Sequence, residues 1–268
     1  NTDDYKIVIR NNVVYNNHTK IKWRTGNIRY SDGNGIIIDV NMSPDGSTTD
    51  EIKADGAYRG KTLVANNVSY FNGGSGIHAF KAANVDIINN TTYHNEQRYK
   101  GEYGEIFSQS GKNNNIVNNV MYARANHKCN NYVSNGGGTY TNNIYCGGTY
   151  TMTTSNLFVN ASKEPMFVKV PEVFGDDADL RLAAGSKAIG FGTYKNYMPE
   201  TDITGADRNA SSIDCGAYVY ESSTSVSAHP LTPLPHNGTA YNIQGQRVGD
   251  EYRGLVIVNG RKRFVKTR

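Results

Sequence analysis

The sequence is poor in leucine, tryptophan and cysteine. Its 268 residues include seven Leu, one Trp and three Cys. Leucine is too scarce for a helical bundle, a leucine-rich repeat or a coiled coil, because these folds depend on helix formers or on a regular leucine pattern. No apolar run approaches the roughly 18 residues that a membrane-spanning helix needs. These absences favour a protein built from strands and turns.

The cysteines give little information about function. Cys129, Cys146 and Cys215 form no Cys-x-x-Cys motif, so they predict neither a zinc site nor a complete disulfide set. A Cys129–Cys146 disulfide would be compatible with an exported protein, but we expect buried thiols.

The net charge of +4 is concentrated at one end of the chain. Residues 237–268 hold seven Lys and Arg against Asp250 and Glu251. Subtracting these from the totals of 28 and 24 leaves 21 basic and 22 acidic residues in 1–236. Because the main part of the chain is nearly neutral, we expect no nucleic-acid partner.

In contrast, asparagine is abundant, with 33 residues, and much of it follows a repeat. Apolar or β-branched residues precede an Asn-Asn pair and a short strand-like stretch follows it, as in 63–71 (LVANNVSYF). The second residue of each pair is Asn12, Asn67, Asn90, Asn119 or Asn143, and a reduced copy is found at Asn156. Three positions later stand Tyr15, Tyr70, Tyr93 and Tyr122. We interpret the 55-residue step from Asn12 to Asn67 as two periods plus an insertion.

A second strand-like stretch lies about midway between the copies, at 33–40, 74–81 and 103–110. One period therefore contains about three short strands, and no segment has helical periodicity. This organisation predicts an all-β fold, a right-handed parallel β-helix, over residues 1–221. Asn tolerates the left-handed conformation of a tight corner and can bond to the rungs on either side, so we expect most of these residues to be scaffold.

The rest of the chain has a different composition. Residues 222–236 are rich in Ser and Pro and predict a linker. Residues 237–268 predict a small β module with a hairpin at Asn259-Gly260. The first residues already have the pattern of an internal rung, whose edge is normally covered, so we expect further rungs upstream.

The rungs resemble those of pectate-lyase-type β-helix proteins. The segments 179–192 (DLRLAAGSKAIGFG) and 202–220 are similar to the last coil of secreted bacterial polysaccharide lyases. The tail, 241–266, resembles the C-terminal modules of exported Bacteroidetes proteins, some of which serve type IX secretion. The resemblance implies a secreted, periplasmic or cell-surface protein that acts as a monomer on a polysaccharide. Because this fold also hosts hydrolases, epimerases, tailspikes and adhesins, the reaction must be argued from a site.

A uronate lyase needs a base for the C5 proton and a cation that neutralises the adjacent carboxylate. The stretch Ala79-Phe80-Lys81 resembles the Gly-x-Phe-Lys stretch of family 9 pectate lyases, although its glycine is displaced to Gly76. The resemblance implies that Lys81 is the base and that the cation is calcium.

Strand alternation places His78, Phe80 and Asp39 on one outward face. Glu105 stands where the aligned rungs have Ile, which indicates either a site residue or, as we prefer, a one-residue error in the alignment. The predicted site contains three groups: catalytic Lys81, His78 and Glu105; substrate-binding Arg59, Phe80, Arg98, Tyr99 and Arg124; and calcium-binding Asp39 and Asp45.

Two other functions remain open. A glycoside hydrolase would need two carboxylates that flank the bond, for example Asp39 and Glu105. A glycan-binding or adhesive β-helix would use the same outward face without any catalytic residue.

Overall fold

The computed structural model describes residues 5–22, 30, 32–42, 58–98, 103–131, 137–151, 155–222, 240–242, 247–249, 254–258 and 261–265. The chain forms two compact units, Asn1–Tyr220 and Glu221–Arg268. Across these described ranges there is no helix that could span a membrane. The first unit is a right-handed parallel β-helix, which confirms the predicted fold.

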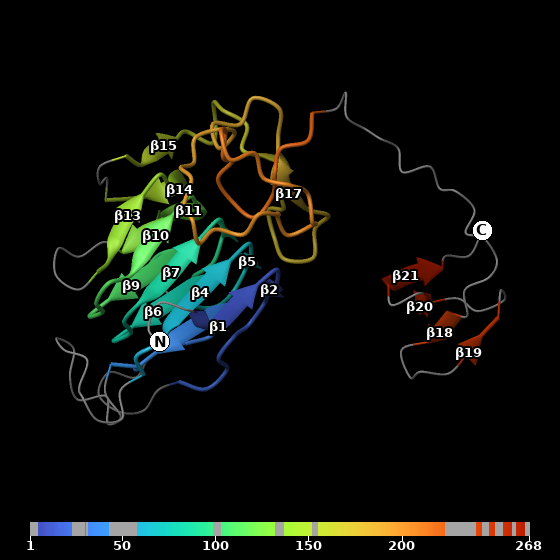
Figure 1. Cartoon of the computed structure of the whole chain (residues 1–268), viewed down its shortest axis with the longest axis horizontal. Helices are drawn as coiled ribbons and strands as arrows, with labels where there is room; N and C mark the ends of the chain where they lie inside the picture. The colour runs from blue at the N-terminus through green and yellow to red at the C-terminus, as the bar shows by residue number, and fades with distance from the viewer. Residues whose placement is uncertain are drawn as a thin grey trace. The chain divides into compact units, whose positions relative to one another are not determined.

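Three parallel sheets run along the first unit, and each of the first four rungs contributes one strand to each sheet (Figure 1). The first sheet contains β1 (Tyr5–Arg10), β4 (Lys61–Ala65), β7 (Val85–Ile88), β10 (Asn115–Val117) and β13 (Thr139–Thr141). The second contains β2 (Val13–Tyr15), β5 (Val68–Tyr70), β8 (Thr91–Tyr93), β11 (Val120–Lys128), β14 (Ile144–Thr149) and β15 (Leu157–Val159). The third contains β3 (Ile36–Asp39), β6 (Ile77–Phe80), β9 (Ile106–Gln109) and β12 (Asn130–Asn131).

The step from Asn12 to Asn67 is one rung and not two, so this part of the sequence interpretation is wrong. The strands β1, β2 and β3 pair directly with β4, β5 and β6. The additional length lies between β2 and β3 and between β3 and β4, and parts of both connections lie outside the described residues. A corner of a solenoid can hold a long loop, because the loop leaves the stacked strands undisturbed.

The two residues of each Asn-Asn pair have different roles. The first residue turns the chain from the first sheet to the second with a left-handed φ of 52° to 59°, at Asn11, Asn66, Asn89, Asn118 and Asn142. The second residue points inward and forms the predicted ladder. Its Nδ2 donates to the Oδ1 of the next rung at 2.9–3.0 Å in an unbroken series from Asn12 to Asn156.

Aliphatic columns fill the interior between the ladders. Ile36, Ile77 and Ile106 lie in register on the inner side of the third sheet and are buried. Cys129, Cys146 and Cys215 are buried free thiols, as expected.

Residues 161–220 form a closing segment that packs on the outer side of the second sheet. The segment includes one antiparallel pair, β16 (Phe167–Lys169) and β17 (Asp179–Leu182). Tyrosines of the second sheet, Tyr70, Tyr93 and Tyr122, pack beneath this segment. The hydroxyl of Tyr93 donates to the carbonyl of Pro171 at 2.7 Å. The corner asparagines also hold the segment, since Asn66 and Asn118 donate to its backbone carbonyls at 2.7 and 2.8 Å. Much of the Asn and Tyr excess is therefore structural.

The second unit is a small antiparallel sheet. Its strands are β18 (Ala240–Asn242), β19 (Arg247–Val248), β20 (Gly254–Val258) and β21 (Arg261–Val265), in the order β19-β18-β20-β21. The pairing of Val258 with Arg261 agrees with the predicted hairpin. Most of the predicted linker lies outside the described residues and stays a prediction.

Candidate functional site

The outward side of the third sheet carries two rows of side chains. Strand alternation directs Ile36 and Ile38 inward and leaves Ile37 and Asp39 exposed. The first outward row is Ile37, His78 and Phe107, and the second is Asp39, Phe80 and Gln109. The expected placement of Asp39, His78 and Phe80 on one face agrees with this register.

Three rings pack together on this side, and we call His78, Phe80 and Phe107 the aromatic face. His78 and Phe80 are partly exposed, whereas Phe107 is only 2% exposed and supports them from one side. The ring centroids of His78 and Phe107 are 4.7 Å apart, and Phe80 lies 6.1 Å from His78 and 6.2 Å from Phe107. Tyr103 packs edge-on against Phe107 at 5.2 Å. Aromatic surfaces of this kind offer large apolar contact area at low conformational cost.

Lys81 lies at the edge of the aromatic face. It follows the last residue of β6 with a left-handed φ of 48°, a corner conformation that Val40 and Ser110 repeat in the neighbouring rungs. Its Nζ lies 5.4 Å from the centre of the Phe80 ring. The rung geometry therefore directs the lysine ammonium over the face.

His78 is a neutral, mostly buried imidazole. Burial lowers its pKa, and the carboxylates of Asp39 and Asp32 only partly oppose this effect. The Nε2 atom lies 3.9 Å from Oδ1 of Asp39, too far for a hydrogen bond, and has no hydrogen-bond partner. This nitrogen is itself buried, so in this structure it is not open to a ligand.

Glu105 is not part of the aromatic face. Ile106, and not Glu105, pairs with Ile77, which confirms the suspected one-residue alignment error. The Glu105 carboxylate is buried and accepts hydrogen bonds from the backbone N–H and the Nδ2 of Asn95 at 2.8 and 2.6 Å. Asp39 is exposed and ends β3, whereas Glu105 precedes β9, so the two carboxylates do not face one another across an open site.

Glu105 terminates a second asparagine ladder that the sequence interpretation missed. Asn17 donates to Asn72 at 3.1 Å, and Asn72 donates to Asn95 at 2.8 Å. Each of these residues stands five positions after the second Asn of a pair, a spacing that was visible in the sequence. The ladder stabilises the corner from which the third sheet begins.

Arg124 lies at the same corner and holds the loop below it. Its guanidinium donates to the backbone carbonyls of Asn95, at 3.3 Å, and of Glu96. His127 adds a contact between its Nε2 and Arg124 at 2.7 Å. Glu96, which is buried, accepts the N–H groups of Tyr103 and Gly104 at 2.7 Å each. In this structure, Arg124 positions the loop that carries Tyr103.

The other predicted site residues are dispersed. Arg59 and Arg98 are exposed, on the segments that precede β4 and β9. Tyr99 and Asp45 lie outside the described residues. In the described part of the chain, no group of three or more His, Cys, Asp or Glu residues could hold a metal ion. The calcium site therefore stays a prediction.

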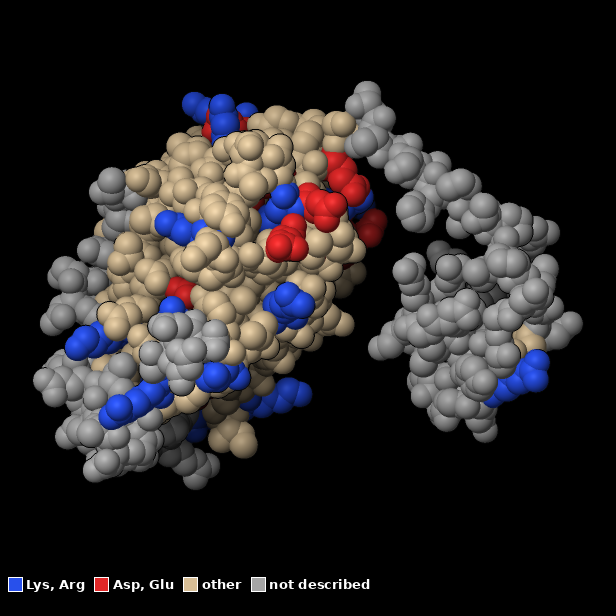
Figure 2. All heavy atoms as spheres, viewed as in Figure 1, with Lys and Arg blue, Asp and Glu red and all other residues tan. Residues whose placement is uncertain are grey.

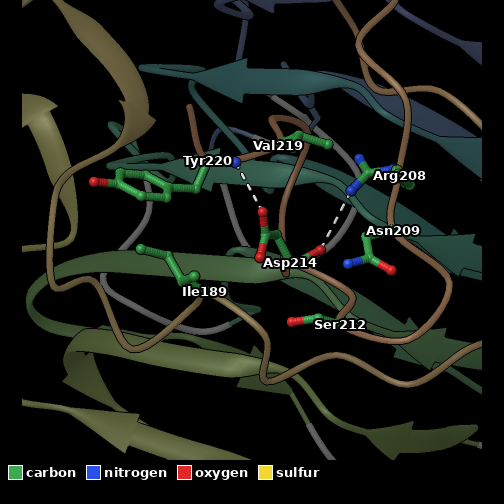
Figure 3. A pocket seen from close by; sticks show the side chains of 7 residues that line it. All are labelled: Ile189, Arg208, Asn209, Ser212, Asp214, Val219 and Tyr220. Carbon is green, nitrogen blue, oxygen red and sulfur yellow. Dashed lines mark hydrogen bonds between the residues drawn. The ribbon is translucent and has the colours of Figure 1, made fainter. Parts of the chain in front are cut away.

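A small pocket of about 210 Å³ lies in the closing segment, where Asp214 and Arg208 line it (Figure 3). Asp214 accepts the N–H groups of Gly190 and Tyr220, and Arg208 donates to the backbone of Asp214 and Gly216. Arg208, which ends the Asp-x-x-Gly-x-x-Arg pattern of 202–208, also donates to Oδ1 of Asn66 at 2.9 Å and so holds the closing segment against the rungs. Because its charged groups are engaged in this way, the pocket belongs to the scaffold.

Comparisons with models of protein families and with curated protein sequences give no match for this chain. Its function must therefore be argued from the geometry of the aromatic face.

The burial of Glu105 predicts an unusual dependence of stability on pH. Full burial raises the pKa of Glu105 to about 8, whereas an unfolded Glu titrates at roughly 4.3. Because the folded pKa is the higher one, the stabilisation is complete below the unfolded pKa and is lost as the pH rises through the folded pKa. We expect the free energy of unfolding to fall by a few kcal/mol over this interval.

Urea unfolding measured at a series of pH values checks this expectation. The variant Glu105→Gln should flatten the profile, and Glu200→Gln, at an exposed position, should leave it unchanged. A Glu105→Gln profile that follows the unsubstituted protein would contradict the assignment.

Proposed function

We propose that the chain is an exported polysaccharide lyase that binds a uronic-acid-containing glycan on the aromatic face and cleaves it by β-elimination, with Lys81 as the base. One observation carries the proposal: the Nζ of Lys81 lies over the partly exposed ring of Phe80, which packs beside the partly exposed His78. A sugar ring stacked on this surface would bring its ring hydrogens close to the lysine.

The proposed reaction requires one proton transfer and one bond cleavage. The neutral amine of Lys81 takes the C5 proton, which is acidic because it is α to the carboxylate. The electron pair left on C5 forms a double bond to C4 as the C4–O bond breaks. The departing sugar oxygen then takes up a proton. Since only the neutral amine can act as a base, cleavage should become faster as the pH rises.

Other residues of the face support binding. The partly exposed ring of His78 can add apolar contact beside Phe80. The exposed Arg59 could approach the uronate carboxylate and reduce its charge in the transition state. Of the two proposed calcium ligands, only Asp39 lies among the described residues, so the mechanism contains no step that depends on calcium.

A panel of pectate, alginate and glycosaminoglycans tests this function. A lyase produces an unsaturated uronate, which absorbs ultraviolet light, together with one new reducing end per cleavage. We expect both signals on at least one glycan, measured with added calcium and with a chelator. Reducing ends without the absorbance would indicate hydrolysis, and the absence of both signals would contradict an enzymatic function.

Glycan binding without cleavage is the second candidate. It is favoured by the position of the Lys81 ammonium over the Phe80 ring, because a cation–π contact stabilises the charged lysine, which is not a base. This candidate predicts binding on the same aromatic face without any product. We do not build a hydrolytic mechanism on Asp39 and Glu105, because Glu105 is buried in the second ladder.

We further propose that the protein acts as a monomer outside the cytoplasm and that residues 237–268 serve its secretion or surface anchoring. The resemblance of the tail supports this proposal, as does the antiparallel sheet formed by that unit. Comparison of the cellular location of the full chain with that of 1–236 tests it.

A further inference from the structure

A cluster of cations surrounds one tyrosine at the corner that leads into the third sheet. The guanidinium carbon of Arg98 lies 5.1 Å from the centre of the Tyr30 ring, and the Nζ of Lys22 lies 5.6 Å from the same ring. Both cations are exposed, as is Lys20. We call Lys20, Lys22, Tyr30 and Arg98 the basic corner.

In the described part of the loop that supplies Arg98, the acidic residues are buried. Glu96 and Glu105 are each only 1% exposed, while Arg98 is on the surface. These two carboxylates are therefore directed into the protein, whereas Asp32, two residues after Tyr30, is exposed. Figure 2 shows a related trend on the face it draws, where most visible acidic side chains gather beside the closing segment and basic ones extend over the end that contains the first rungs.

His18 lies beside the same positive charges. Burial lowers its pKa, and the positive charges of Arg98 and Lys20 lower it further. Its Nδ1 atom is buried and has no hydrogen-bond partner. Like charges that gather in this way repel one another, and an anionic ligand would relieve the repulsion.

The basic corner borders the aromatic face. Asp32, two residues after Tyr30, lies near enough to His78 to influence its charge, and β3 begins shortly afterwards. Asp32 is also the acidic group nearest in sequence to Tyr30 on this loop. A ligand on the aromatic face can therefore extend directly onto the basic corner.

We propose that the basic corner is a second contact site for an anionic polysaccharide and binds carboxylate or sulfate groups on sugars distant from Lys81. This inference rests on the proposed function of the aromatic face. The corner precedes the strands of the third sheet, whereas Lys81 follows β6, so one four-residue strand, about 13 Å long, separates the two. A monosaccharide cannot reach both positions, and affinity should therefore increase with the length of the glycan.

Binding to an inactive protein tests the inference without interference from cleavage. In a Lys81→Ala background, affinity for polygalacturonate and for its neutral methyl ester is measured by calorimetry at two salt concentrations. We expect the acidic polymer to bind more tightly, and Arg98→Gln or Lys22→Gln to weaken its binding roughly three- to tenfold. Arg98→Lys should retain most of the affinity, and Lys163→Gln, at an exposed position in the closing segment, should have no effect.

The outcomes separate this inference from the proposed function. If both polymers bind equally, or if Arg98→Gln binds like Lys163→Gln, the basic corner is not a glycan-binding site. This holds even if Lys81 is required for cleavage. If Arg98→Gln binds more weakly but the protein never forms an unsaturated product, binding at the basic corner is supported and the proposed lyase activity is wrong. Tighter binding of DNA or of anionic lipid vesicles than of any acidic glycan would overturn the choice of ligand.

Discussion

Replacing Lys81 with alanine should reduce the rate of glycan cleavage by roughly 10²–10⁴-fold, the usual contribution of a general base. Glycan affinity should change little, because the partly exposed rings of Phe80 and His78 would supply the apolar contact surface. The loss should therefore be seen in kcat more than in KM, as expected for a group that acts in the transition state. Initial rates of product absorbance over a range of pH measure both parameters.

Lys112 provides a matched control for Lys81. It is an exposed lysine near the corresponding corner of the next rung. Its backbone pairs there with that of Ala83, two residues after Lys81. Lys112→Ala should leave cleavage unchanged, and Lys81→Arg should bind glycan but cleave poorly, because a guanidinium is very difficult to deprotonate. A Lys81→Ala variant that cleaves as fast as Lys112→Ala would exclude Lys81 as the base.

Replacing Asn90 with alanine should cause the largest loss of stability among the ladder residues. Its Oδ1 accepts the backbone N–H and the Nδ2 of Asn67, and its own Nδ2 donates to Val64, Ile88 and Asn119. The side chain is completely buried, so its removal leaves several polar groups without water or partner. Since each unsatisfied group costs about 1–3 kcal/mol, we expect a loss of at least about 4 kcal/mol.

Urea unfolding followed by circular dichroism measures this loss. Asn196, which is exposed in the closing segment, is the control, and Asn196→Ala should change stability by less than about 0.5 kcal/mol. Asn90→Asp separates the two halves of the interaction, because it keeps the acceptor and removes the donor. If Asn90→Ala proves as stable as Asn196→Ala, the ladder is not a major source of stability.

Prediction of the candidate site was incomplete for a specific reason. Alternation within a strand is a local property, so the outward positions of His78, Phe80 and Asp39 could be derived from the sequence. Phe107 was missed because an error of one residue at Glu105 exchanges the inward and outward sides of β9. The contact of Arg98 with Tyr30 joins two long loops from different rungs, which no local pattern encodes.

The sequence by itself determined the β-helix and the position of its rungs, because every rung needs the same corner and the same inward amide, and these requirements repeat as Asn-Asn pairs. Tertiary structure decided which strands meet. It made the 55-residue step a single rung, placed Glu105 at the end of a buried ladder, and brought Arg98 to Tyr30. Loop length does not affect stacking of the rungs, so these pairings depend on long-range packing and not on any periodic signal.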